Sequence, residues 1–445
     1  MHCTPYQPSD ASKPYDQIAH MEYLIDHYSR PSWASLSAHD DQQPRPTSIL
    51  LTGSTGNLGS YILALLIADP NVARIYALNR SSPKGPAFER VAAQFQKKGL
   101  DVAALRSEKV SFIEGDTTKS DLGLNNASLY NEIRDTITII LHNAWPINLR
   151  NDLTYFEPQI LGLKNLIDLG HASPHASTLR FVFISSFQAY QSWHMHHNAL
   201  LPEQPINETA VGCGIGYGAS KYVAESVRDS ALAPTILLGQ SQILARSGLN
   251  TTAMRLTQLC GTTRADYWSP FEWIPILMSA GVQVGVLPDV AGLMAFVPMD
   301  DAAKCVHEIV SCKQVLPAAI NVSHPRPISW NILFETINNV LKEQRNLDPL
   351  PTMPFSKWLL FLRDSAYLAK IRHPSLMLIP GTRGMAISND DIVRRGRQDV
   401  DHFPKPHLSI DAAETYSSSL RDLKEITPEG VRGWVEYVIS MIPNL

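Results

Sequence analysis

A short apolar stretch that passes through a glycine-rich turn into an apolar helical pattern constrains this chain more than any other feature. Residues 49–51 (ILL) lead into residues 52–59 (TGSTGNLG), so a G-x-x-G-x-x-G pattern falls at a junction of strand and helix. There the first glycine permits a tight turn, the second lets backbone N–H groups approach a pyrophosphate, and the third allows close helix packing. The helix N-terminus also favours an anion. The sequence therefore predicts a dinucleotide site formed by Thr52, Gly53, Thr55, Gly56, Asn57, Leu58 and Gly59.

Two other interpretations of this turn are weaker. A phosphate-binding G-x-x-x-x-G-K loop does not fit, because Leu58 and Gly59 stand where the second glycine and the lysine would be. An ordinary tight turn remains the alternative, and the position of the turn between a strand and a helix argues against it.

Short apolar stretches alternate with helical patterns from residue 47 to about residue 245. We expect strands at 48–52, 74–79, 109–114, 136–142, 180–185 and 235–238, with helices that begin near 57, 153 and 218 or end near 96. This alternation is typical of an α/β fold with a doubly wound parallel sheet. The sequence therefore predicts a Rossmann domain that binds the nucleotide over residues 47–245.

The remaining segments differ from this pattern. Residues 246–445 are expected to form a smaller, mostly helical substrate-binding region, from which a strand near 319–322 returns to the sheet. Residues 1–46 are rich in Pro, Ser, Asp and His apart from a helical pattern around 18–28, and are expected to be a leader or linker.

Composition excludes several classes of protein. Hydrophobic residues make up 44% of the 445 residues and charged residues 18%, which indicates a folded chain. The net charge of −4, without a run of Lys and Arg, argues against a nucleic-acid or anionic membrane partner. The longest apolar stretch, 276–297, is interrupted by Gln283, Pro288 and Asp289, so no membrane span is expected.

The cysteines and the N-terminus indicate a compartment. Five scattered cysteines without a C-x-x-C pair suggest neither a disulfide framework nor a thiolate metal site. The first residues also lack the basic and apolar segments of a secretory signal. A reducing, cytoplasmic location is therefore expected.

The residues after the second strand indicate which dinucleotide binds. A cofactor with a free ribose 2′-hydroxyl usually meets an Asp or Glu about 20 residues after the glycine turn, whereas this chain has Asn79 and Arg80. Because arginine pairs with phosphate and an acid would repel it, NADPH is favoured, with Arg90 as a second contact. A solvated arginine is the alternative. Asp116, which follows the third strand, is expected to accept a hydrogen bond from the adenine amine.

Tyr217 and Lys221 are the candidate acid and its partner. Four residues apart on a predicted helix, they share one face. A cation beside a phenol stabilises the phenolate and lowers its pKa toward the working range. Such pairs are common on ordinary exposed helices, so the assignment depends on its context.

That context comes from the ends of two strands. Ligands of such sheets lie at the carboxyl ends of the strands, where 136–142 is followed by Asn143, Ala144 and Trp145, and 180–185 ends at a serine pair. A serine that polarises a carbonyl, a tyrosine that donates a proton and a lysine that keeps the phenol acidic form a coherent reductase set.

Several segments together resemble a known family. They are 51–60 (LTGSTGNLGS), 79–80 (NR), 113–116 (IEGD), 141–148 (LHNAWPIN), 156–157 (FE), 181–190 (FVFISSFQAY), 217–226 (YGASKYVAES), 238–240 (LGQ), 268–275 (WSPFEWIP), 287–288 (LP) and 297–300 (VPMD). The chain resembles the extended short-chain dehydrogenase/reductases, and among them the terminal thioester reductase domains of nonribosomal peptide and polyketide synthases and of carboxylic acid or aminoadipate reductases.

The resemblance implies roles for individual residues. It implies that Ser186, rather than Ser185, is the catalytic hydroxyl, that Tyr217 is the proton donor, and that Lys221 lowers the tyrosine pKa and binds the nicotinamide ribose. It places Asn143, Ala144, Tyr217 and Lys221 at the cofactor, and Trp145, Gln240, Trp268 and Trp273 at the substrate.

The function implied by the resemblance is NADPH-dependent reduction of an acyl thioester on the phosphopantetheine arm of an acyl or peptidyl carrier protein. The product would be an aldehyde, which a second hydride could convert to an alcohol. The alternatives are an extended reductase of free aldehydes, ketones or acyl-CoA, and a non-catalytic dinucleotide sensor.

The segment 193–216 departs from the family pattern, which leaves the substrate pocket open. His194, His196 and His197 in this segment could in principle bind zinc, but no carboxylate or thiolate accompanies them at a fixed spacing. No metal site is therefore expected.

Overall fold

A seven-stranded parallel sheet forms the centre of the molecule. The computed structural model describes residues 16–29, 45–226, 249–263, 267–290, 292–364, 386, 389–390, 393–394 and 408–442. The strand order is β11-β6-β5-β4-β1-β2-β3, and every pairing is parallel. The strands are β1 (Thr47–Thr52), β2 (Val72–Asn79), β3 (Val110–Glu114), β4 (Ile139–His142), β5 (Arg180–Ser186), β6 (Asn250–Leu256) and β11 (Ala319–Val322). The predicted doubly wound α/β fold is confirmed.

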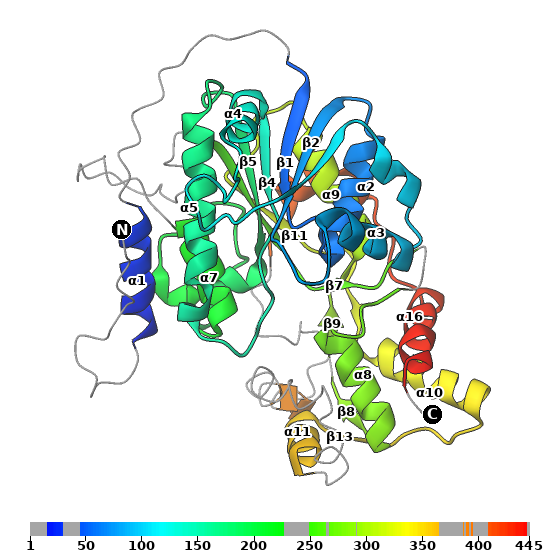
Figure 1. Ribbon diagram of the computed structural model, residues 1–445. Coiled ribbons are helices and arrows are strands. Elements are labelled where there is room, and N and C mark those ends of the chain that lie inside the picture. Colours follow the sequence, from blue (N-terminus) through cyan, green and yellow to red (C-terminus); the bar gives the residue numbers. More distant parts are fainter. Residues whose placement is uncertain are drawn as a thin grey trace.

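Helices cover both faces of this sheet (Figure 1). One face carries α2 (Asn57–Ala68), α3 (Ala87–Lys97) and α9 (Met299–Ser311), and the other carries α4 (Ala127–Thr136), α5 (Glu157–Ala172) and α7 (Gly216–Ser226). Ile49 and Leu51 of β1 lie in the core of the first face, whereas Leu50 lies in the core of the second. Successive side chains of a strand point to opposite faces, so a strand between two helical layers is apolar throughout.

Two strands from beyond residue 245 belong to the sheet. The partner of β5 is β6, whose first residue, Asn250, lies opposite Arg180, and β11 forms the edge beyond β6. The sheet therefore does not end at the expected domain limit. The strand expected at 235–238 lies outside the described residues.

The helix α4 was not predicted from the sequence. It ends at Thr136, and β4 begins only at Ile139. The strand expected at 136–142 therefore starts three residues later than predicted. Ile133 is the one fully buried residue of this helix, and its start is fixed by the Asn126 side chain, which accepts from two backbone N–H groups. A helix with so narrow a buried face gives little apolar periodicity.

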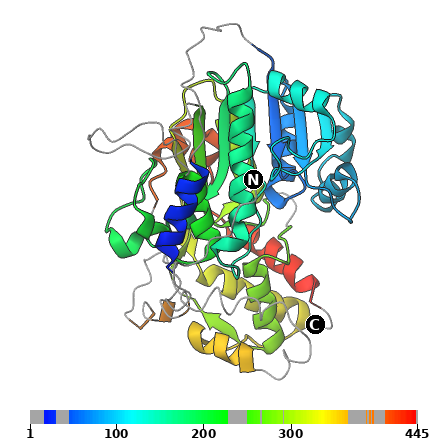
Figure 2. The ribbon, with the colours of Figure 1, turned by 60° about the vertical axis from the view of Figure 1, so that its left-hand side comes forward.

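Part of the expected leader belongs to the folded unit. Helix α1 (Gln17–Tyr28) packs against α7 and α5, with Met21 and Leu24 fully buried (Figure 2). The Gln17 side chain donates to the Gly214 carbonyl oxygen at 3.0 Å and accepts from the Gly214 N–H at 2.9 Å. The Tyr28 hydroxyl donates to Glu157 at 3.0 Å. The helical pattern around 18–28 therefore forms a layer that packs on α7 and α5.

The C-terminal part has its own core beneath the carboxyl ends of the strands (Figure 1). Its helices are α8 (Trp273–Val284), α10 (Asn331–Arg345), α11 (Phe355–Asp364) and α16 (Pro428–Ser440). Three strand pairs accompany them: β7 (Leu259–Cys260) with β10 (Val297–Pro298), β9 (Leu293–Met294) with β12 (Ile328–Ser329), and β8 (Leu287–Asp289) with β13 (Thr352–Pro354). Helices α14 (Asp411–Tyr416) and α15 (Ser418–Arg421) return to pack against α9. The second half of the chain thus contributes to both cores.

Short helices connect these elements. They are η1 (Val102–Arg106), η2 (Leu153–Phe156), η3 (Phe187–Tyr190), α6 (Trp193–His196) and η4 (Thr209–Gly212). Within the described residues, no helix combines the length and apolar character needed to span a bilayer.

Candidate active site at the carboxyl ends of the strands

A large cavity opens at the carboxyl ends of the central strands. Its volume is about 1550 Å³, and its walls come from the glycine turn, the ends of β2, β4 and β5, helix α7 and the start of α8. Every predicted cofactor residue except Gly59 lines it. The predicted catalytic residues Ser186, Tyr217 and Lys221 line it as well. One cavity therefore brings together nearly all of the predicted site.

The glycine turn is packed too tightly for side chains. Gly53 has a φ of +77°, and a Cβ there would lie 2.9 Å from the Ala144 backbone nitrogen. A Cβ on Gly59 would lie 2.1 Å from the Gly53 carbonyl oxygen, so this glycine permits close packing rather than lining the cavity. The Asn143 side chain donates to the same oxygen at 3.3 Å. Glycine is therefore required at both positions by the packing of the turn against Ala144 and against itself.

Two polar side chains hold the turn in place. The Thr52 hydroxyl oxygen accepts from the N–H groups of Asn143 at 3.1 Å and Ala144 at 3.0 Å, which joins the ends of β1 and β4. The Asn79 side chain accepts from the Thr55 N–H at 3.3 Å and donates to the Ser54 hydroxyl at 2.8 Å. The end of β2 thus fixes the turn after β1.

The predicted phosphate contacts lie along the cavity wall beyond β2. Arg80 is exposed there, whereas the Arg90 guanidinium donates to the carbonyl oxygens of Gly85 at 2.9 Å and Arg80 at 2.6 Å. Arg90 also pairs with Glu114 at 3.4 Å. In this structure Arg90 therefore braces the loop that presents Arg80. The Asp116 carboxylate accepts from the N–H and the hydroxyl of Thr118, at 3.0 and 2.8 Å.

Tyr217 and Ser186 meet in the cavity. Both are buried and line the cavity, and the interaction with the Ser186 side chain lowers the pKa of the Tyr217 phenol. The neighbouring Ser185 hydroxyl instead donates to the Glu225 carboxylate inside the protein. Ser186 is therefore the serine of the pair that contacts Tyr217.

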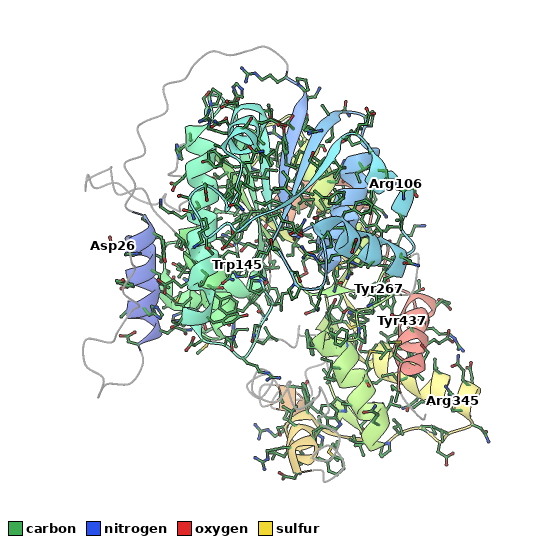
Figure 3. All side chains as sticks on the ribbon, in the orientation of Figure 1. Asp26, Arg106, Trp145, Tyr267, Arg345 and Tyr437 are labelled. Atoms are coloured by element: carbon green, nitrogen blue, oxygen red, sulfur yellow. The ribbon has the colours of Figure 1, made fainter. Side chains whose placement is uncertain are left out.

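Lys221 points toward aromatic rings and a backbone carbonyl. Its ammonium donates to the Ile184 carbonyl oxygen at 2.7 Å and lies 4.5 Å from the centre of the Trp145 ring and 4.4 Å from that of Phe183. Burial lowers the pKa of Lys221 well below its ordinary value, and the charge of Glu225 partly opposes this. Trp145, labelled in Figure 3, contacts both the sheet and α7, because its ring packs against Phe183 of β5 and its indole N–H donates to the Ser220 hydroxyl at 3.2 Å.

Burial, rather than Lys221, dominates the acidity of Tyr217. It raises the pKa of the phenol to about 12, and the hydrogen bond with Ser186 only partly offsets this. The expectation that Lys221 lowers this pKa is therefore wrong for this structure, in which the lysine faces Ile184. A phenol in this state keeps its proton at neutral pH, as a proton donor must.

A buried ionic network behind the cavity was not predicted from the sequence. The Arg255 guanidinium, fully buried, donates to Glu225 at 3.0 Å and to the Tyr190 hydroxyl at 2.8 Å. The Tyr190 hydroxyl in turn donates to Glu225 at 2.8 Å. With Ser185, these groups join β5, β6, η3 and α7 next to the predicted catalytic residues. Nothing local in the sequence marks this pair, because β6 also contains the polar residues Asn250 and Thr251 and does not give the pattern of a buried strand.

The predicted substrate residues separate into three groups. Trp145 and Trp273 line the cavity. Trp268 is 1% exposed and packs edge to face against Trp434 in the C-terminal core, so it is not placed at the cavity wall. Gln240 lies outside the described residues. Gln258, two residues beyond β6, lines the cavity and accepts from the Trp273 indole N–H at 2.7 Å.

The histidine-containing segment lies near Glu208. The rings of His197 and His196 approach the Glu208 carboxylate at 2.7 and 3.8 Å. Among the described residues, no group of three or more His, Cys, Asp or Glu side chains could hold a metal ion.

Comparison with known proteins agrees with this geometry. The family model described as male sterility protein, an NAD-binding domain, matches residues 51–306. The chain belongs to this family. The family is one of domains that bind a nicotinamide dinucleotide, and the relatives of this chain are named reductases.

Its relatives in sequence are longer proteins. It is 35% identical to an adenylate-forming reductase of Serpula lacrymans over 398 residues. The matched region covers 88% of this chain and 35% of that protein. Over 429 residues it is 26% identical to a carboxylic acid reductase of Neurospora crassa, covering 93% of this chain and 37% of the relative. The chain thus spans little more than a third of the length of these relatives.

Solved reductase domains share the fold. The terminal R domain of the myxalamid PKS-NRPS pathway superposes with a TM-score of 0.73 at 18% identity, over 96% of this chain and 98% of that domain. The PhqB reductase domain of Penicillium fellutanum gives a TM-score of 0.63 at 16% identity, with the same coverage of 96% and 98%.

Proposed function

We propose that this chain is an NADPH-dependent thioester reductase that releases a carrier-bound acyl group as an aldehyde. The observation that carries the proposal is the Tyr217–Ser186 hydroxyl pair, which lies in the cavity that the glycine turn also lines. The names of the relatives, an adenylate-forming reductase and a carboxylic acid reductase, support the same reaction class.

The residues of the cavity fit a dinucleotide. The backbone at Gly53 and Gly59 has no space for a Cβ, and the turn leads into the N-terminus of α2, which favours a pyrophosphate. Asn143, Ala144 and Lys221 would hold the nicotinamide end, where the bound cofactor supplies a hydride. Arg80 supports NADPH over NADH, because its guanidinium suits a 2′-phosphate.

The chemistry then depends on the hydroxyl pair. As the thioester carbon accepts a hydride, Tyr217 donates its proton to the carbonyl oxygen, and Ser186 donates a hydrogen bond to the same oxygen. The resulting thiohemiacetal returns its hydroxyl proton to Tyr217 as the carbon–sulfur bond breaks. The products are an aldehyde and a thiolate, which takes a proton from water.

The proposed partner is an acyl or peptidyl carrier protein with a phosphopantetheine arm. Two exposed apolar side chains at the cavity, Ile147 and Phe271, are 77% and 80% exposed and suit contact with a partner or its acyl chain. We propose the cytoplasm as the compartment, since Cys213, Cys260, Cys305 and Cys312 are free thiols.

The proposal is tested by NADPH oxidation with a panel of acyl thioesters carried on a carrier protein, on CoA and on pantetheine, beside free aldehydes. We expect turnover to be fastest with the carrier-bound thioesters and aldehyde to appear as the product. Faster turnover of free carbonyls or acyl-CoA would instead support a general extended reductase. NADPH binding without oxidation of any substrate would support a dinucleotide sensor.

A further inference from the structure

One carboxylate of the C-terminal part reaches the cofactor turn. Glu272, the residue before α8, lines the cavity and accepts from the Asn57 side-chain amide at 2.9 Å. Its second oxygen accepts from the Trp268 indole N–H at 3.1 Å. Asn57 is the first residue of α2, the helix whose N-terminus faces the expected pyrophosphate. Glu272 therefore places an acid where the ligand brings negative charge.

A buried lysine supports the same turn from the other side. The Lys98 ammonium, 2% exposed, donates to the Asn57 carbonyl oxygen at 3.0 Å and to the Ser60 hydroxyl at 2.6 Å. Burial lowers the pKa of Lys98 to about 7, and the charge of Glu272 opposes this. The first turn of α2 is thus held between an acid and a base.

The remaining titratable groups that face Glu272 are uncharged at neutral pH. Cys260 of β7 and Tyr267 interact electrostatically with it, and burial raises the pKa of both groups. Lys98 is therefore the charged group that offsets Glu272 among the described residues.

We propose that Glu272 is a positioning residue of the dinucleotide site, which orients Asn57 and takes up a proton when a dinucleotide pyrophosphate binds at the turn. The inference rests on the proposed cofactor site. Burial already raises the pKa of the Glu272 carboxyl to about 7. Because a nearby anion disfavours the ionised carboxylate, the bound ligand raises this pKa further. Binding therefore consumes protons, and affinity falls as pH rises above about 7.

Titration calorimetry of the full chain with NADPH measures this uptake, when repeated in buffers of different ionisation enthalpy. At pH 7.5 a carboxyl with a free pKa near 7 should take up about 0.8 of a proton, and at pH 6 only about 0.1. Glu272→Gln retains an oxygen for Asn57 but cannot titrate, so its uptake should be smaller by that amount. Above pH 7 the NADPH affinity of the parent should fall by up to about tenfold per pH unit. The affinity of Glu272→Gln should not show this fall.

A second variant separates Glu272 from Lys98, which could also take up a proton. The arginine of Lys98→Arg stays charged at every accessible pH. This variant should therefore still show the part of the proton uptake that comes from Glu272. The inference is overturned if Glu272→Gln keeps the full uptake while Lys98→Arg loses it. It is also overturned if the parent binds NADPH without proton uptake or pH dependence, a result that needs no variant to fold. Failure of the parent to bind NADPH at all would instead refute the proposed cofactor site.

Discussion

Replacing Arg255 should destabilise the protein far more than a surface charge change would. Its guanidinium is fully buried and donates to Glu225, to the Tyr190 hydroxyl and to the carbonyl oxygens of Pro202 and Gln204, the last two at 3.1 Å. Arg255→Met would leave the Glu225 carboxylate, 2% exposed, with two hydroxyl donors and without the guanidinium that is paired with it. Removal of one partner from a buried pair costs about 3–5 kcal/mol.

That cost is a large part of the whole stability, since the free energy of unfolding of a domain is about 5–15 kcal/mol. Glu225→Gln should cost a similar amount, because it leaves the guanidinium uncompensated. The double variant Arg255→Met/Glu225→Gln removes both charges of this pair, so it should be more stable than the sum of the single effects by about 2 kcal/mol or more.

Urea denaturation followed by tryptophan fluorescence gives the free energies of unfolding. Asp168→Asn is the matched control, because it breaks a half-exposed helix pair with Lys164 and should cost about 0.5 kcal/mol or less. The reasoning is refuted if Arg255→Met costs less than about 1 kcal/mol, or if the single effects add in the double variant.

Three further substitutions test the cavity. Gly53→Ala places a Cβ 2.9 Å from the Ala144 backbone at a positive φ, so NADPH affinity should fall by at least tenfold in a fluorescence titration, and unaltered binding would contradict the packing of the turn. Arg80→Asp should weaken NADPH binding by about 10- to 100-fold and NADH binding much less, and equal losses would remove Arg80 from the 2′-phosphate. Tyr217→Phe should lower kcat by about 100- to 10,000-fold with NADPH affinity retained, and loss of binding instead would make Tyr217 structural.

The sheet could be predicted because its strands are short and apolar on both faces. Where local signals were faint, the prediction failed: α4 buries essentially Ile133 alone, and β6 contains the polar residues Asn250, Thr251 and Arg255. The strand expected at 235–238 lies outside the described residues, whereas β6, which pairs with β5, was not predicted.

The candidate site could be predicted where a short motif holds its residues together. The glycine turn and the pair of Tyr217 and Lys221 follow from local spacing, whereas the choice of Ser186 followed from the family resemblance. Contacts between distant segments were not predictable: Glu272 and Asn57 are 215 positions apart, and nothing local in the sequence marks their pairing. The acidity of Tyr217 was misjudged for a related reason, because it depends on burial, which spacing does not reveal.

The position of α1 bears on where this domain can be cut from a longer chain or exchanged for another. A fragment that starts at Thr47 would retain every strand, the glycine turn and the hydroxyl pair. It would also lack α1 and so expose the apolar surface of α7, because Met21 and Leu24 share a buried cluster with Tyr222 and Val223. Exposed apolar surface of this kind promotes aggregation. Chimeras and expression fragments should therefore begin before Asp16, whose side chain caps the first turn of α1.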